Sequence, residues 1–173
     1  VSHTGEREDA QSILKELTTT HPEFAEAWSL YGGLLQARGD YPAAEAAFAT
    51  ASSLNRFRLN DRLSLVAVQV EQGKHNEAAK ELEQLEKIIP DHPGVNYAQA
   101  RIQIENGNAS AGLGELAKVL NVAPDHLPSL YLAANANFRE GNLATAEDQL
   151  SRFLAAQPRN INARQMLAAV YLR

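Results

Sequence analysis

Apolar and polar residues follow the period of an amphipathic helix along most of the chain, and the same arrangement returns every 34 residues. In residues 25–58, Trp28 and Leu35 lie on one face of a first helix. Gly39 then marks a tight turn, and a second apolar stripe that contains Phe48 follows it. The pattern therefore predicts a helix, a turn and a second helix in each unit.

Three kinds of residue recur at this spacing. Glycines mark the turns at Gly39, Gly73, Gly107 and Gly141, and small residues stand in the second helices at Ala44, Ala78, Gly112 and Ala146. Prolines separate the units at Pro22, Pro90, Pro124 and Pro158, with Arg56 at the vacant site. A helix-turn-helix unit with this 34-residue period is typical of tetratricopeptide repeats. The chain resembles that family over residues 5–173.

The resemblance implies an all-α fold, a right-handed α-solenoid of tandem repeats. We predict one solenoid over residues 1–173, with a partial repeat at 5–24, four full repeats at 25–58, 59–92, 93–126 and 127–160, and a partial repeat at 161–173. We expect ten helices of about 12–15 residues, joined by turns of about 2–5 residues. Because the chain starts at Val1 without an initiator methionine and stops one helix into a new repeat, we expect it to be a piece of a longer array.

The recurring residues have physical reasons. Glycine at the turn supplies the left-handed backbone that ends a helix, and Asp40, Asn108 or Asn142 after it can cap the next helix. Small residues in the second helix let the paired helices approach closely. Large residues fill the space between the helices, and we expect the following five to be buried: Trp28, Phe48, Leu82, Leu116 and Leu150.

Some positions depart from the pattern. Arg62 stands where the preceding repeat has Trp28, and Gly5 falls on the turn position of the first partial repeat. Gly112 and Gly114 lie inside one second helix. Each interior glycine costs about 1 kcal/mol relative to alanine, so we expect helix 109–122 to be the least stable one inside the array.

The helices at both ends of the array lack a neighbouring repeat. We therefore expect exposed apolar stripes at Met166, Leu167 and Val170 and at Leu14 and Leu17. Exposed apolar faces favour association, so these stripes predict end-to-end self-association.

Composition narrows the possible functions. The net charge of −5 gives nucleic acid no long-range attraction. No run of 18 apolar residues occurs, so we expect no membrane span. The chain has no cysteine, which excludes disulfides, thiolate metal sites and cysteine nucleophiles.

No catalytic or metal-binding motif accompanies the repeats. The sequence has no GxSxG, P-loop, HExxH or glycine-rich dinucleotide turn. His92 and His126 occupy equivalent turns one repeat apart, which is too far to share a metal ion. We interpret these two, with His21 and His75, as solvent-exposed turn residues. We therefore predict no enzyme activity, no metal and no cofactor.

The family resemblance points to a second stripe on each first helix, which in tetratricopeptide repeats lines a concave groove for extended peptides or partner helices. A helix advances 100° per residue, so this stripe is separate from the one that packs on the partner helix. We predict a ligand-binding groove formed by Leu63, Val70, Tyr97, Arg101, Ile104, Tyr131, Asn135, Phe138 and Arg139. Its apolar part suits a peptide or amphipathic helix of a protein partner, and its polar groups would fix the register.

An alternative is that the chain is a structural spacer within a longer array, with no groove ligand. The rings of Tyr97, Tyr131 and Phe138 also suit packing between neighbouring repeats. The carboxylate-clamp subfamily has lysine at the position of Ser29, where the next repeat has Leu63. We therefore do not expect chaperone C-termini of that type as partners.

A narrower resemblance begins at Asp125. The stretches Ala146-Glu147, Phe153-Leu154-Ala155 and Leu167-Ala168-Ala169 are similar to large bacterial tetratricopeptide lipoproteins of PEP-CTERM/exosortase systems. This resemblance implies an exported scaffold linked to exopolysaccharide assembly, in the bacterial cell envelope or periplasm. A cytoplasmic location is the alternative, and the lipid-anchoring cysteine of that family is absent here.

Overall fold

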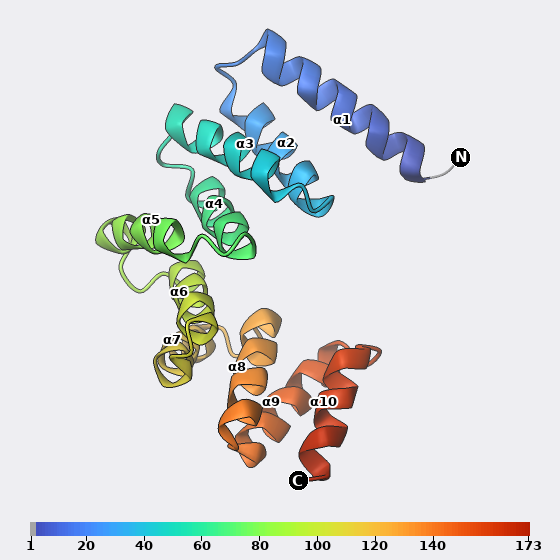
Figure 1. The fold of residues 1–173 in the computed structure, drawn as a ribbon, viewed down its shortest axis with the longest axis vertical. Helices are drawn as coiled ribbons and strands as arrows, with labels where there is room; N and C mark the ends of the chain where they lie inside the picture. Colours follow the sequence, from blue (N-terminus) through green and yellow to red (C-terminus); the bar gives the residue numbers. More distant parts are fainter. Residues whose placement is uncertain (1–2) are drawn as a thin grey trace. The chain divides into compact units, whose positions relative to one another are not determined.

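The structure is a computed structural model that describes the backbone of residues 3–173 and the side chains of residues 9–173. Residues 3–173 form ten helices and no strand (Figure 1). The helices are α1 (His3–Thr20), α2 (Ala25–Ala37), α3 (Tyr41–Leu54), α4 (Leu59–Glu71), α5 (His75–Ile88), α6 (Pro93–Glu105), α7 (Ala109–Val122), α8 (Leu127–Glu140), α9 (Leu143–Ala156) and α10 (Ile161–Tyr171). The all-α fold predicted from the sequence is confirmed.

The glycine turns have the predicted backbone. The φ angles of Gly39, Gly73, Gly107 and Gly141 are +78°, +71°, +85° and +81°, in the left-handed region that glycine adopts without a steric penalty. The following Asp40 caps α3, because its carboxylate accepts a hydrogen bond from the Ala43 amide at 3.3 Å.

The capping prediction is wrong for the two asparagines. Neither Asn108 nor Asn142 makes a side-chain cap. Their amides instead donate to polar side chains of the preceding first helix, Asn108 to Gln103 at 3.2 Å and Asn142 to Asn137 at 3.1 Å. These hydrogen bonds orient each amide toward the first helix and not over the N-terminus of the next one.

The second helices end without help from proline. α5, α7 and α9 each end two residues before one of the recurring prolines. α3 ends at Leu54, two residues before Arg56, which takes the place of that proline. The missing proline therefore does not move the helix end. A helix stops where its apolar stripe and neighbours stop, and proline only disfavours continuation.

The chain divides into two compact units, residues 1–84 and 85–173, and the division falls within α5. In the first unit α2 packs against both α1 and α3, and α3 also packs against α4 (Figure 1). Its core is formed by Leu35, Ala44, Ala47, Phe48, Leu65 and Val68. The small residue Ala44 is fully buried, as the close approach of paired helices requires.

In the second unit α6 pairs with α7, α8 pairs with α9, and α10 packs on α9 and α8. The largest core cluster contains Leu130, Ala134, Ala146, Leu150, Phe153, Ala163 and Val170. Leu116 and Leu150 are fully buried here, and Leu82 and Phe48 are buried in the first unit. Four of the five residues expected to be buried are therefore buried.

Trp28 is the exception, since it is only half-buried. Its indole N–H donates a hydrogen bond to the Pro22 carbonyl at 2.9 Å. An indole N–H needs an acceptor when it leaves water, and this carbonyl in the α1–α2 turn supplies one near the surface. The prediction of full burial is therefore wrong.

The end helices also differ from expectation. Val170 is buried and Met166 and Leu167 pack against the core cluster of the second unit, so this stripe is not exposed. α10 packs on both α8 and α9, which cover it. Leu14 and Leu17 are likewise half-buried. α1 runs from His3 through Gly5 without a turn, because glycine permits a left-handed turn but does not impose one.

Arg62 is buried in the place where the preceding repeat has Trp28. Its guanidinium forms an ion pair with Glu81 of α5, and it donates a further hydrogen bond to the Gln84 side chain at 3.3 Å. The charge is thus taken out of water together with its partner, which is the condition for burying it.

Candidate interaction surface

The first helices of the second unit lie next to one another, because α8 contacts both α6 and α10. α6 carries the predicted groove residues Tyr97, Arg101 and Ile104. α8 carries Tyr131, Asn135, Phe138 and Arg139. Tyr97, Arg101 and Ile104 stand at the same repeat positions as Tyr131, Asn135 and Phe138. We refer to the seven predicted residues on these two helices as the α6–α8 strip.

The remaining predicted residues, Leu63 and Val70, lie on α4 in the first unit. Leu63 is half-buried, whereas Val70 is only 4% exposed. Little of the Val70 side chain is open to a ligand. The α6–α8 strip, by contrast, lies wholly within the second unit.

Each aromatic ring of the strip is half-buried and rests on another side chain. Tyr97 meets the His126 ring edge-on, with centroids 5.5 Å apart and an interplanar angle of 80°. Tyr131 packs on Phe153, with centroids 5.1 Å apart. Such contacts hold the rings in place and leave their outer parts exposed, so the strip is preorganised.

The Phe138 ring makes a cation–π contact with an arginine. The guanidinium carbon of Arg173 lies 4.5 Å from the ring centroid, within the range of a cation–π contact. The ring is half-buried and also packs against the core cluster of the second unit. Phe138 therefore joins the core to the surface at the α8–α10 end of the strip.

The polar residues of the strip differ in their availability. Arg101 pairs with Glu105 one helical turn away, at 3.5 Å. The Asn135 side chain is half-buried, and no hydrogen bond within residues 9–173 engages its amide. Arg139 is exposed. Asn135 and Arg139 are thus the polar groups that the strip can offer to a partner most directly.

Ile104 faces its own repeat as much as the surface. It packs in a cluster with Leu116, Leu113 and Tyr97, and its side chain lies beside Gly112 of α7. Its position in the strip therefore serves mainly the packing of α6 on α7.

A cleft also lies at a place where the repeat pattern predicts no binding site. This cleft of about 320 Å³, which we call the α7–α9 cleft, opens between α7, α8 and α9 and is lined mainly by apolar side chains with three amides. Its lining residues are Leu113, Leu116, Ala117, Leu120, Asn121, Ala133, Asn137, Thr145 and Gln149. Ala133 is the sequence signal that could have indicated it, because two earlier repeats have Leu65 and Tyr31 at this position.

In the first unit, the hydroxyl of Ser29 makes a hydrogen bond within the chain. It donates a 2.5 Å hydrogen bond to the carboxylate of Asp61, which is 2% exposed. Arg58 also pairs with Asp61, at 2.5 Å, and this hydrogen bond raises the pKa of Arg58. A polar hollow of about 340 Å³ beside these residues is lined by Phe57, Arg58, Leu59, Asn60 and Asp61. Because its charges pair with each other, we interpret this cluster as a link between α2 and α4.

The histidines are less exposed than predicted. His92 is half-buried, and its Nδ1 accepts a hydrogen bond from the Gly94 amide at 3.1 Å. His126 is half-buried too, and its Nδ1 shares a 2.7 Å hydrogen bond with the Ser129 hydroxyl. His75 is also half-buried, whereas His21 is exposed. His92 and His126 are the N-cap residues of α6 and α8 and are half-buried, so their interpretation as solvent-exposed residues is wrong.

Within the described residues, no group of three or more histidine, aspartate or glutamate side chains is arranged to hold a metal ion. None of the described helices combines the length and apolarity needed to cross a bilayer.

Comparison with solved structures shows the same fold in several proteins. A chain of the APC/C hetero-tetramer Cut9–Hcn1 matches with a TM-score of 0.87 and 16% identity, over 98% of this chain and 34% of that one. TTC0263, a thermophilic TPR protein of Thermus thermophilus, matches with a TM-score of 0.79 and 18% identity, over 98% of this chain and 93% of that one. YrrB, described as a TPR protein with an unusual peptide-binding site, matches with a TM-score of 0.64 and 18% identity, over 94% of this chain and 84% of that one.

The chain thus spans about a third of the Cut9–Hcn1 chain that it matches, and these identities show the fold alone. No curated protein matches the chain significantly in sequence. The family profile described as tetratricopeptide repeat matches residues 4–67 and 69–137, which is more than half of the chain. The chain belongs to the tetratricopeptide repeat family.

Proposed function

We propose that the chain is a non-catalytic scaffold for protein–protein interaction, and that the α6–α8 strip binds a peptide or a helix of a protein partner. The observation that carries this proposal is the row of half-exposed rings, Tyr97, Tyr131 and Phe138, on two first helices that contact each other. Aromatic side chains provide large contact area at small entropic cost, and such residues dominate the affinity of many interfaces.

The surroundings of the rings support the same function. The contacts with His126, Phe153 and Arg173 fix the rings before a partner arrives, which lowers the entropic cost of binding. The Asn135 amide lies between the two ring positions of α8 and is available for a backbone group of the partner. An apolar strip with one central amide suits an extended peptide or an amphipathic helix.

The test uses a random-peptide display library selected on the whole chain. Affinities of the enriched peptides are then measured for the wild type, Tyr131→Ala and Phe138→Ala. Thr145→Arg is the matched control, because exposed Thr145 lines the α7–α9 cleft and not the strip. We expect the two alanine variants to lose more than about 1 kcal/mol of binding free energy and the control to bind normally. A loss of affinity confined to Thr145→Arg would indicate that the peptides bind in the cleft and not on the strip.

The second candidate function is a structural spacer without a groove ligand. The observation that favours it is that every ring of the strip already contacts another side chain inside the chain. In that case Tyr131→Ala and Phe138→Ala lower the melting temperature, while the folded protein binds any selected peptide as the wild type does. Thermal denaturation, measured beside the affinities, separates the two functions.

We also propose self-association through the exposed apolar side chains of Tyr171 and Leu172, which are adjacent at the end of α10. Exposed apolar side chains that lie together favour contact with another chain. Sedimentation equilibrium at increasing concentration tests this. A monomer at the highest concentration would contradict it.

The cellular setting rests on the resemblance of residues 125–173 to envelope-associated bacterial repeat lipoproteins. On that basis we propose a scaffold in the cell envelope or periplasm linked to exopolysaccharide assembly. Fractionation of the native host tests this, and recovery of the full-length protein in the cytoplasm would contradict it.

A further inference from the structure

The α8–α10 end of the strip combines a ring with two arginines. Phe138 and Arg139 are adjacent near the end of α8, and Arg173 follows α10, which packs on α8. Arg139 and Arg173 occupy equivalent positions one repeat apart. The corresponding residue of α6 is Glu105, so the charge at this position changes sign along the strip.

The contact between Arg173 and Phe138 leaves hydrogen-bonding capacity unused. The guanidinium lies over the ring, with its carbon 4.5 Å from the centroid. A cation–π contact is made with the guanidinium charge and does not use up its five N–H donors. No carboxylate within residues 9–173 pairs with Arg173 or with Arg139, and both are exposed.

Arg101 differs from these two arginines. Glu105 lies 3.5 Å from its guanidinium, so an incoming carboxylate would have to compete with a carboxylate that is already present. The C-terminal dipole of α8 offsets only part of the Arg139 charge, since it amounts to about half an elementary charge. A free anion-binding group therefore exists at the α8–α10 end of the strip and not at α6.

We propose that this end of the strip recognises an acidic segment of the partner protein, in which a carboxylate lies next to a large apolar side chain. The apolar side chain packs on the exposed part of Phe138, and the carboxylate accepts hydrogen bonds from Arg173 and Arg139. A guanidinium held on a ring is preorganised for a two-point hydrogen bond to a carboxylate. This inference rests on the function proposed above and defines the chemistry of its partner.

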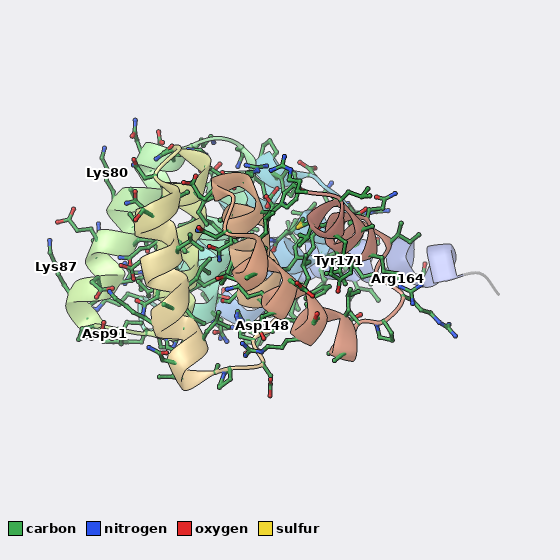
Figure 2. The ribbon with its side chains drawn as sticks, turned by 90° about the horizontal axis from the view of Figure 1, so that it is seen from below. Lys80, Lys87, Asp91, Asp148, Arg164 and Tyr171 are labelled. Atoms are coloured by element: carbon green, nitrogen blue, oxygen red, sulfur yellow. The ribbon has the colours of Figure 1, made fainter. Side chains whose placement is uncertain are left out.

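Arg164 provides a matched control. It lies near the start of α10, whereas Arg173 follows the end of that helix, so nearly the whole length of α10 separates the two. Figure 2 shows the Arg164 side chain extending outward from the chain, and it is exposed. Arg159, in the turn before α10, is exposed too, so the double control Arg159→Glu/Arg164→Glu changes the net charge by as much as Arg139→Glu/Arg173→Glu does, but near the start of α10.

The experiment uses the peptides enriched from the random display library. We expect them to carry aspartate or glutamate beside a large apolar residue. In the double variant Arg139→Glu/Arg173→Glu their affinity should fall by about tenfold or more at low salt, whereas the double control Arg159→Glu/Arg164→Glu should change it by less than about twofold. Raising the salt from about 0.05 M to about 0.5 M should shrink the difference between wild type and the double variant.

Several results would overturn this inference. Enriched peptides that depend on Phe138 but lack acidic residues, or that bind the double variant as tightly as the wild type, would leave the proposed function standing and remove its acidic specificity. Equal losses in the double control and in the double variant would show an effect of net charge alone. Peptides that bind without dependence on Tyr131 or Phe138 would instead contradict the proposed function itself. Binding of anionic phospholipid vesicles, with no acidic peptide enriched, would assign the arginines to a membrane surface.

Discussion

Ile104 occupies the space beside Gly112 that a methyl group would need. A Cβ added to Gly112 would lie 2.5 Å from Cγ1 of Ile104 and 2.9 Å from the Ala100 carbonyl oxygen. At Gly114, two residues further along α7, an added Cβ would meet no atom within 4 Å. The two glycines of this helix therefore have different reasons to be there, since only the first permits the close approach of α6 and α7.

The first prediction concerns these two glycines. Gly112→Ala should destabilise the protein. Overpacking costs about 1–3 kcal/mol, which outweighs the gain of about 1 kcal/mol in helix propensity. Gly114→Ala should stabilise it by up to about 1 kcal/mol and slow amide exchange in α7. Urea denaturation measures the free energies of unfolding. If Ile104 is the obstacle, Gly112→Ala should cost less in an Ile104→Ala background, and additive effects would contradict this.

The second prediction concerns the buried ion pair of Arg62 and Glu81. Arg62→Ala should destabilise the first unit by about 1–3 kcal/mol, because it leaves the half-buried Glu81 carboxylate without its partner. The double variant Arg62→Leu/Glu81→Leu should be clearly more stable than Arg62→Ala, since an apolar pair needs no compensation. Denaturation followed in the first unit tests both variants. Equal stability of the single and double variants would refute the mechanism.

The third prediction concerns a buried amide. Asn96 on α6 is 2% exposed, and its side-chain oxygen has no hydrogen-bond partner in the described part of the chain. Leu130 fills the equivalent position one repeat later. Asn96→Leu should therefore stabilise the second unit by about 1–3 kcal/mol, the cost of leaving a polar group unsatisfied. Leu130→Asn is the reciprocal control and should destabilise. A destabilising Asn96→Leu would indicate that water satisfies the amide.

The fourth prediction concerns pH. Burial by itself would raise the pKa of Glu45, but hydrogen bonds from Lys74, Gln72 and Gln69 and the Lys74 charge lower it below the ordinary value of 4.5. The Lys74 ammonium lies 2.5 Å and the Gln72 amide 2.8 Å from the same carboxylate oxygen. A carboxylate with a lowered pKa contributes stability above its unfolded pKa and loses that contribution as the pH falls through the folded value.

The free energy of unfolding of the first unit should therefore fall as the pH is lowered below about 4.5. Glu45→Gln should be less stable than the wild type near neutral pH and should show a flatter acid limb. Exposed Glu140→Gln is the control and should keep the wild-type profile. Carboxyl NMR titration measures the Glu45 pKa directly, and a value at or above 4.5 would contradict the prediction.

The repeat pattern predicts the helices well because it records backbone and volume requirements that are local. A left-handed turn at Gly39 and a small residue at Ala44 are needed by each helix pair separately. Features that depend on partners in other helices are not recorded in this way. Glu81, which makes Arg62 tolerable, belongs to the following helix, and the acceptor that draws Asn108 from its capping position belongs to the preceding one.

The candidate site is predictable only in part for the same reason. The 34-residue spacing places Tyr97 and Tyr131 on adjacent helices, and α6 and α8 do contact each other. The rotation of each ring depends on its neighbours, and the arginine that covers Phe138 comes from beyond α10. The α7–α9 cleft depends on the volume missing at Ala133, which periodicity does not show.

The central claim is that the α6–α8 strip is the face that binds a partner. Photo-crosslinking tests it most directly, with benzoylphenylalanine placed either at half-buried Asn135 in the strip or at exposed Thr145 in the α7–α9 cleft. Both variants are incubated with the same enriched peptide after circular dichroism shows that they are folded. We predict a covalent adduct from position 135 that excess unlabelled peptide abolishes, and none from position 145. An adduct from position 145 alone would contradict the claim.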